Sequence, residues 1–135
     1  MSASQHYRVS PELNERTLRI LKARLPALEE ALNSHFKVFF STAKQDHWGG
    51  KTHIVEPSMR FDTGVEFVIL IDEAEYSTLD DIGKDALLCH ELYHIMRSPN
   101  GAPKLRRHAY LGGIDFCELP QHDAFSQLLA RSVAR

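Results

Sequence analysis

The sequence predicts an α+β fold in which helices pack on a small twisted β-sheet. Two segments with apolar residues at helical spacing, and a short run of β-branched residues between them, lead to this prediction. The chain has 135 residues, of which 43% are hydrophobic and 25% charged, and this suits one compact domain with a single core. We therefore expect one domain over residues 1–135, with residues 1–10 flexible.

The first helix is expected from Pro11 to about Leu32. Its leucines recur mostly at steps of three and four residues, with charged residues between them: Leu13, Leu18, Leu21, Leu25, Leu28 and Leu32. Ser10 followed by Pro11 has the form of an N-cap and a first-turn proline. Pro26 should kink the helix or divide it in two, because proline lacks the backbone N–H that a helix interior needs. We expect this amphipathic segment to cover a sheet.

Three segments read as strands. His35 to Ser41 contains three phenylalanines and a valine, and Lys51 to Val55 follows a turn signal at Gly49 and Gly50. The run Val65 to Ile71, VEFVILI, is too short for a typical helix and rich in β-branched residues. It is the clearest strand in the chain.

Helical spacing returns from about Leu79 to Arg97. Residues 77–81 supply N-cap candidates and first-turn acids, and Pro99 ends the pattern. We expect a polar, basic loop from Asn100 to Gly113 and a last helix from about Asp123 to Val133.

The second predicted helix carries the pattern H-E-x-x-H, from His90 through Glu91 to His94. Residues four apart lie on one helix face, so both imidazoles can bind one ion, and zinc prefers such nitrogen ligands. Glu91 is rotated by roughly 100° from His90 and can reach a water molecule at the metal. It can accept a proton from that water and then protonate a leaving amine. The pattern predicts a zinc hydrolase with Glu91 as its catalytic base.

A catalytic zinc site normally has three protein ligands, so a third is expected downstream. The candidates are His108, Asp115, Cys117, Glu118, His122 and Asp123. His122 is preferred because it lies just ahead of the last predicted helix, and His108 is the alternative. Arg97 and Asn100 stand where the extended motif of metzincins has glycine and histidine, which disfavours that class.

Five other residues have weaker functional interpretations. His47 and His53 could pair across a hairpin, although surface histidines without a third ligand are usually solvated. Cys89 and Cys117 read as free thiols, and Cys89 as a packing residue. Tyr93 could donate a hydrogen bond to a substrate oxyanion, but helix aromatics more often pack.

The run VEFVILIDEAEYSTLDDIGKDALLCHELYHI, followed by NGAPKLRRH and HDAF, resembles the phage-type metallopeptidases, small zincin-like proteins of phage and prophage genomes. The resemblance spans Leu32 to Ala130. The family pattern A-L-L-x-H-E-L-x-H is matched by Ala86, Leu87, Leu88, His90, Glu91, Leu92 and His94. The family's H-D-x-x-E-F is kept only as His122 and Asp123. The chain also has extra residues between Arg107 and His122 relative to the family, which leaves His108 open as the equivalent ligand.

This resemblance implies a zincin-like fold: the first helix over the sheet, the H-E-x-x-H helix against the same sheet, and a C-terminal helix closing the site. Strand 65–71 would lie near the cleft, at its edge, where an extended peptide can pair with it. The implied function is zinc-dependent peptide hydrolysis. The alternative is a non-catalytic zinc-binding interaction protein of a phage or prophage.

The formal net charge is −2, and cationic and anionic residues are interspersed, so the charge does not indicate nucleic acid as a partner. The basic stretch Lys104 to Arg107 leaves open a weaker option, a protease acting on DNA-associated proteins. The chain shows neither a secretion signal nor an apolar stretch that could span a membrane. We therefore expect a cytoplasmic protein without membrane contact, in the bacterial host cell if phage-derived.

Overall fold

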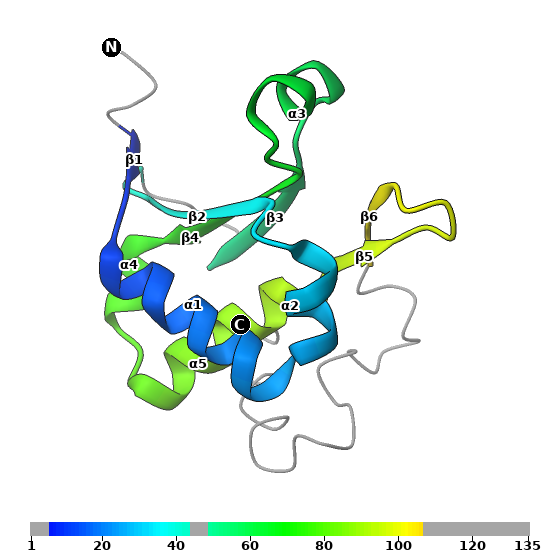
Figure 1. Ribbon diagram of the computed structural model, residues 1–135. Coiled ribbons are helices and arrows are strands. Elements are labelled where there is room, and N and C mark those ends of the chain that lie inside the picture. The colour runs from blue at the N-terminus through cyan, green and yellow to red at the C-terminus, as the bar shows by residue number, and fades with distance from the viewer. Residues whose placement is uncertain (1–5, 44–48, 107–135) are drawn as a thin grey trace.

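Helices cover one face of a mixed four-stranded sheet in the computed structural model, which describes residues 6–43 and 49–106 (Figure 1). The predicted α+β class is thereby confirmed. The expected last helix, Asp123 to Val133, lies outside the described residues. Among the residues described, no helix is long and apolar enough to cross a membrane.

The sheet has the strand order β1-β2-β4-β3. Its strands are β1 (Tyr7–Arg8), β2 (Phe36–Ser41), β3 (Gly50–Ile54) and β4 (Phe67–Asp72). β2 and β4 are parallel, whereas β1 and β3 run antiparallel to their neighbours.

The position of β4 corrects one expectation. We expected an extended peptide to pair with this strand, but β2 and β3 already pair with its two sides, and β3 is the edge strand among the described residues. The reason is the alternation of its side chains: Phe67, Ile69 and Ile71 are fully buried on one face, while Val68 and Leu70 are half-buried on the other. A strand that is apolar on both faces is suited to the interior of a sheet.

Pro26 divides the first predicted helix into α1 (Pro11–Arg24) and α2 (Pro26–Leu32). The Ser10 hydroxyl accepts a hydrogen bond from the Leu13 N–H, as expected of an N-cap. Ser10 and β1 both fall within the segment that we expected to be flexible.

The second predicted helix is shorter than expected. After α4 (Glu73–Ser77), α5 begins at Asp81, where the side chain of Asp80 caps the Gly83 N–H at 2.8 Å, and it ends at Tyr93 rather than Arg97. Residues 95–97 form β5 (Ile95–Arg97), which pairs with β6 (Pro103–Leu105) inside the segment that we expected to be a loop.

The β5–β6 hairpin has identifiable causes. Gly101 has a φ of 88°, which only glycine adopts without strain. The Arg97 guanidinium donates to the Glu66 carboxylate at 2.5 and 3.1 Å and to the Gly101 carbonyl at 3.0 Å. These contacts draw the chain out of the helix and fold it back on itself.

A further helix, α3 (Pro57–Thr63), was not predicted. It ends at Gly64, which has a φ of 75°. The ribbon shows α3 standing away from the sheet and the other helices (Figure 1). It buries none of its residues, and its Phe61 is 94% exposed.

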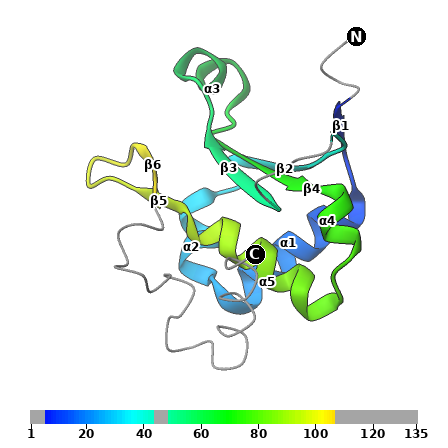
Figure 2. The ribbon, with the colours of Figure 1, turned by 180° about the vertical axis from the view of Figure 1, so that it is seen from behind.

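The hydrophobic core lies between the sheet and the pair α1 and α5, as two opposite views show (Figures 1 and 2). Its largest fully buried side chains come from the helices and the two central strands: Leu13, Leu21, Leu32, Val38, Phe67, Ile69, Ile71, Leu88 and Leu92. Every residue of α5 from Ala86 to Tyr93 is buried. The core therefore sets the position of α5.

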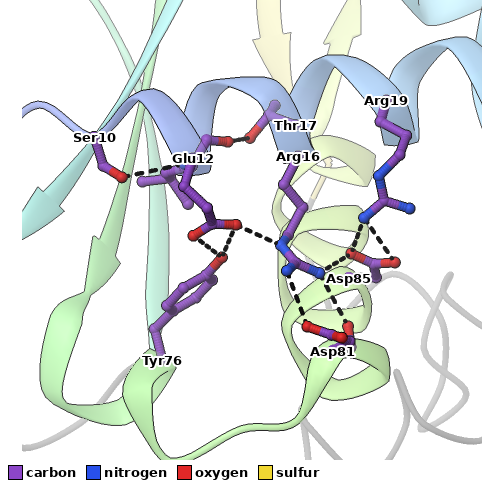
Figure 3. Close-up of polar contacts among 9 residues, drawn as sticks. Ser10, Glu12, Arg16, Thr17, Arg19, Tyr76, Asp81 and Asp85 are labelled. Carbon is purple, nitrogen blue, oxygen red and sulfur yellow. Dashed lines mark hydrogen bonds and ion pairs between the residues drawn. The ribbon is translucent and has the colours of Figure 1, made fainter.

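Polar contacts attach α5 to α1 (Figure 3). The Arg16 guanidinium contacts Glu12 at 2.8 Å within α1, and Asp81 at 3.0 Å and Asp85 at 2.8 Å at the start of α5. The Tyr76 hydroxyl donates to the same Glu12 carboxylate. This network, the Arg16 cluster, joins segments about 65 residues apart in the sequence.

Candidate metal site

His90, Glu91 and His94 come together at the C-terminal end of α5. One potential donor atom from each lies within 4.8 Å of the others, and no other group that could hold a metal ion is found within residues 6–43 and 49–106. His90 and Glu91 are each only 4% exposed, and His94 is half-buried. Polar groups so deeply buried in native proteins are normally satisfied by a partner or a ligand.

The two imidazoles are arranged as a shared metal ion requires. The Nε2 atoms of His90 and His94 are 3.3 Å apart, and the ring planes are at 90° to each other. A tetrahedral zinc ion with bonds of about 2.0 to 2.1 Å separates two nitrogen ligands by about 3.3 Å. The pair therefore fits zinc without rearrangement.

A backbone carbonyl orients the His94 ring. Nδ1 of His94 lies 2.6 Å from the carbonyl oxygen of Arg106. Because a carbonyl can only accept, Nδ1 carries the hydrogen and Nε2 presents its lone pair toward His90. Such contacts outside the ligand set hold a metal-binding histidine in the required tautomer.

The β5–β6 hairpin brings this carbonyl to the site. The Arg106 N–H donates to the His94 carbonyl at 2.7 Å, so the two residues face each other just past the pairing of Ile95 with Leu105. If α5 had continued to Arg97, as predicted, the His94 carbonyl would accept the N–H four residues later in the helix instead of the Arg106 N–H. Nothing in the local pattern signalled this contact.

The Glu91 side chain meets the edge strand β3. The Thr52 hydroxyl lies 2.8 Å from Glu91 Oε1 and 3.1 Å from the Glu91 carbonyl oxygen. Gly50, two residues earlier on the same strand face, lies directly against the Glu91 carboxylate. Sequence reasoning missed both residues, because they are about 40 positions from Glu91 and the glycine pair read only as a turn.

The described residues among the others that we singled out, Cys89, Tyr93 and His53, do not belong to this group. Cys89 is a free thiol in the core, and burial raises its pKa to about 12, in agreement with a packing role. Tyr93 also belongs to the core. Burial, and to a smaller extent Lys51, lowers the pKa of His53, while His47 and Cys117 lie outside the described residues.

The proposed third ligands, His122 and His108, also lie outside the described residues, as do the other downstream candidates. The last described residue, Arg106, is the one that contacts His94. The chain thus passes the two histidines immediately before the segment that contains all six candidates.

A family model described as "Putative phage metallopeptidase" matches residues 5–133 of the chain. The match covers nearly the whole sequence and includes every residue of the site. No curated protein and no solved structure shows significant similarity to the chain.

Proposed function

We propose that this chain, which belongs to the phage metallopeptidase family, is a zinc-dependent peptidase with a zincin-like fold. The observation that carries the proposal is the pair of His90 and His94 nitrogens 3.3 Å apart, beside a buried Glu91. This arrangement brings two imidazole nitrogens and a carboxylate together in one buried site. Catalytic zinc sites use the same donor types.

In this proposal each residue has a distinct role. Zinc, when bound, acts as a Lewis acid that polarises the peptide carbonyl and makes water a better nucleophile. His90 and His94 bind the ion, and the Arg106 carbonyl keeps His94 in the binding tautomer. Glu91 accepts the proton of the attacking water and passes it to the nitrogen of the leaving amine.

We propose His122 as the third ligand, with His108 as the alternative. Both follow Arg106, which contacts His94, and a chain advances at most about 3.3 to 3.6 Å per residue, so each can return to the ion. Zinc content of the purified His122→Ala and His108→Ala proteins separates the two. The variant that loses zinc identifies the ligand, and loss of zinc from neither would refute both assignments.

The edge strand β3 is the proposed place for the substrate backbone. It lies at the end of the sheet, contacts α5, and holds the two residues that touch Glu91. Among the described strands, only β4 pairs with β3. An extended peptide could therefore add to its other side by main-chain hydrogen bonds. We propose a peptide or protein substrate in the cytoplasm rather than nucleic acid.

The central experiment compares Glu91→Gln with His90→Ala and His94→Ala. Glu91→Gln keeps the shape of the side chain, so it should retain zinc and thermal stability but lower hydrolysis of fluorescein-labelled casein by at least about 100-fold. The histidine variants should lose zinc as well as activity. Zinc-free wild-type protein, or zinc content unchanged by His90→Ala, would overturn the metal assignment.

The exposed helix α3 favours a second function, a non-catalytic interaction protein of a phage or prophage. Its Met59 and Phe61 present apolar surface that the described part of the chain leaves uncovered. A biological activity that persists in the Glu91→Gln protein would support this alternative over hydrolysis.

A further inference from the structure

We propose that Thr52 and Gly50 of β3 are positioning residues that hold the Glu91 carboxylate in one orientation. The inference rests on the proposed function, because it assigns these residues to the action of Glu91 as a base. A glutamate side chain has three rotatable bonds, so its carboxylate needs outside contacts to keep one position. A misplacement of about 1 Å can lower a rate by about 100-fold.

Thr52 provides an attractive contact. Its side chain is 8% exposed, and its hydroxyl lies 2.8 Å from Oε1 of Glu91. Hydrogen bonds to a carboxylate are stronger than neutral ones, and burial strengthens them further. Because Thr52 is β-branched and lies in a strand, few rotamers are open to it, and the direction of its hydroxyl is well defined.

Gly50 provides a steric contact. A Cβ atom at this position would lie 2.8 Å from Cγ, 3.0 Å from Cδ and 3.1 Å from Oε2 of Glu91. The positive φ values of described glycines are at Gly64 and Gly101, so the backbone of Gly50 does not itself require glycine. The Glu91 carboxylate therefore occupies the space that a side chain at position 50 would need.

A purely structural role is the competing explanation. The Thr52 hydroxyl is also 3.1 Å from the Glu91 carbonyl oxygen, so it could serve only to attach α5 to β3. That role predicts that zinc is lost together with stability. The positioning role predicts a loss of turnover with zinc content and KM retained.

The experiment uses four variants of the full chain. Thr52→Val removes the hydroxyl and keeps the shape, while Thr52→Ser keeps the hydroxyl. Gly50→Ala displaces the carboxylate, and Gly49→Ala is its matched control, because a Cβ there would approach the side chain of Glu75 at 3.2 Å rather than Glu91. Each protein is measured for zinc content, melting temperature, and kcat and KM toward fluorescein-labelled casein, and its metal-free crystal structure is determined.

We expect kcat to fall by about 10- to 100-fold in Thr52→Val and Gly50→Ala, with zinc content and KM unchanged. Thr52→Ser and Gly49→Ala should stay within about threefold of wild type. In the metal-free crystal structures the Glu91 carboxylate should be displaced in the first pair and retained in the second. The crystal structures test the positioning even if the wild-type protein proves inactive on casein, an outcome that refutes only the proposed function.

Three outcomes would overturn the inference. One is a Glu91 carboxylate that keeps its place in both Thr52→Val and Gly50→Ala. Another is a Thr52→Ser protein as impaired as Thr52→Val. The last is a loss of zinc in every variant that loses turnover, which would show that the contacts only hold the site together. If Thr52→Val fails to fold, the Gly50→Ala protein still tests whether the Glu91 carboxylate is displaced.

Discussion

His94 is the residue between the end of α5 and the start of β5. Its backbone is still helical, with φ −67° and ψ −21°, so it keeps the one-turn spacing from His90. Its carbonyl already accepts the N–H of Arg106 across the hairpin, and its ring contacts the Arg106 carbonyl. One residue therefore meets two requirements, helical spacing to its partner ligand and an outside acceptor for Nδ1.

Cys89 precedes His90 in α5 and lies in the hydrophobic core. Because burial raises the pKa of its thiol to about 12, almost no thiolate exists at pH 8. In a Cys117→Ser protein, which leaves Cys89 as the remaining cysteine, we expect no reaction with Ellman's reagent until urea unfolds the chain. Rapid labelling of the native protein would contradict the packing role.

At the scale of elements, α5 is held by contacts from three neighbours. The core fixes its buried face, β3 contacts it at Glu91, and the Arg16 cluster attaches its first turns to α1. In Glu12, burial alone would raise the pKa, but hydrogen bonds from Arg16 and Tyr76 lower it below the usual value. The cluster thus favours the charged form of the Glu12 carboxylate.

Removal of Arg16 should destabilise the fold. Its side chain is only 13% exposed, and Arg16→Ala leaves the partly buried Asp85 with Arg19 as its one ion-pair partner among the described residues. We expect the free energy of unfolding in urea to fall by about 1 to 2 kcal/mol. The control is Lys22→Ala, because Lys22 is 69% exposed and 3.7 Å from Glu29. Equal effects of the two substitutions would refute a special role for the Arg16 cluster.

The β5–β6 hairpin should show a pH-dependent stability. Hydrogen bonds from Arg97 lower the pKa of Glu66, against the opposite effect of burial and with help from His35. A lowered folded-state pKa means that this stability is present above the usual glutamate value of 4.5 and is lost as the pH falls through the lowered value.

Urea unfolding of metal-free wild type and Arg97→Gln between pH 3 and 6 tests this expectation. Wild type should be more stable by about 1 kcal/mol at pH 6, and the difference should shrink toward pH 3. A difference that stays constant over this range would show that the Glu66 carboxylate does not carry the effect.

At the scale of the whole molecule, the described core does not depend on the metal site. The buried apolar residues of α1, β2, β4 and α5 pack together, and the site lies at one end of α5. The protein should therefore differ from zinc fingers, which unfold without their ion.

Removal of zinc with EDTA should leave the far-UV circular dichroism spectrum nearly unchanged and lower the melting temperature. Free zinc at 1,000 times its Kd adds about 4 kcal/mol to the stability, because it binds only the folded chain. An unfolded metal-free protein would contradict the separation of core and site.

Much of the local structure was predictable. Pro26 does divide the first helix, because proline lacks the backbone N–H that a hydrogen bond within the helix needs, and this effect is local. The three predicted strands all occur, because their β-branched and aromatic residues prefer an extended backbone. The end of α5 was wrong by four residues, because strand pairing of Ile95 to Arg97 outweighed their helical spacing.

Residue patterns alone predict the fold class and the adjacency of His90 and His94, since one helical turn brings residues four apart together whatever surrounds them. Which strand lies at the edge of the described sheet, and which groups touch the site, depends on how the elements pack. The Thr52 hydroxyl, the space at Gly50 and the Arg106 carbonyl reach Glu91 and His94 from other elements. Such contacts form between residues far apart in the sequence, when the core packs α5 against β3 and the hairpin folds back, so local residue patterns cannot predict them.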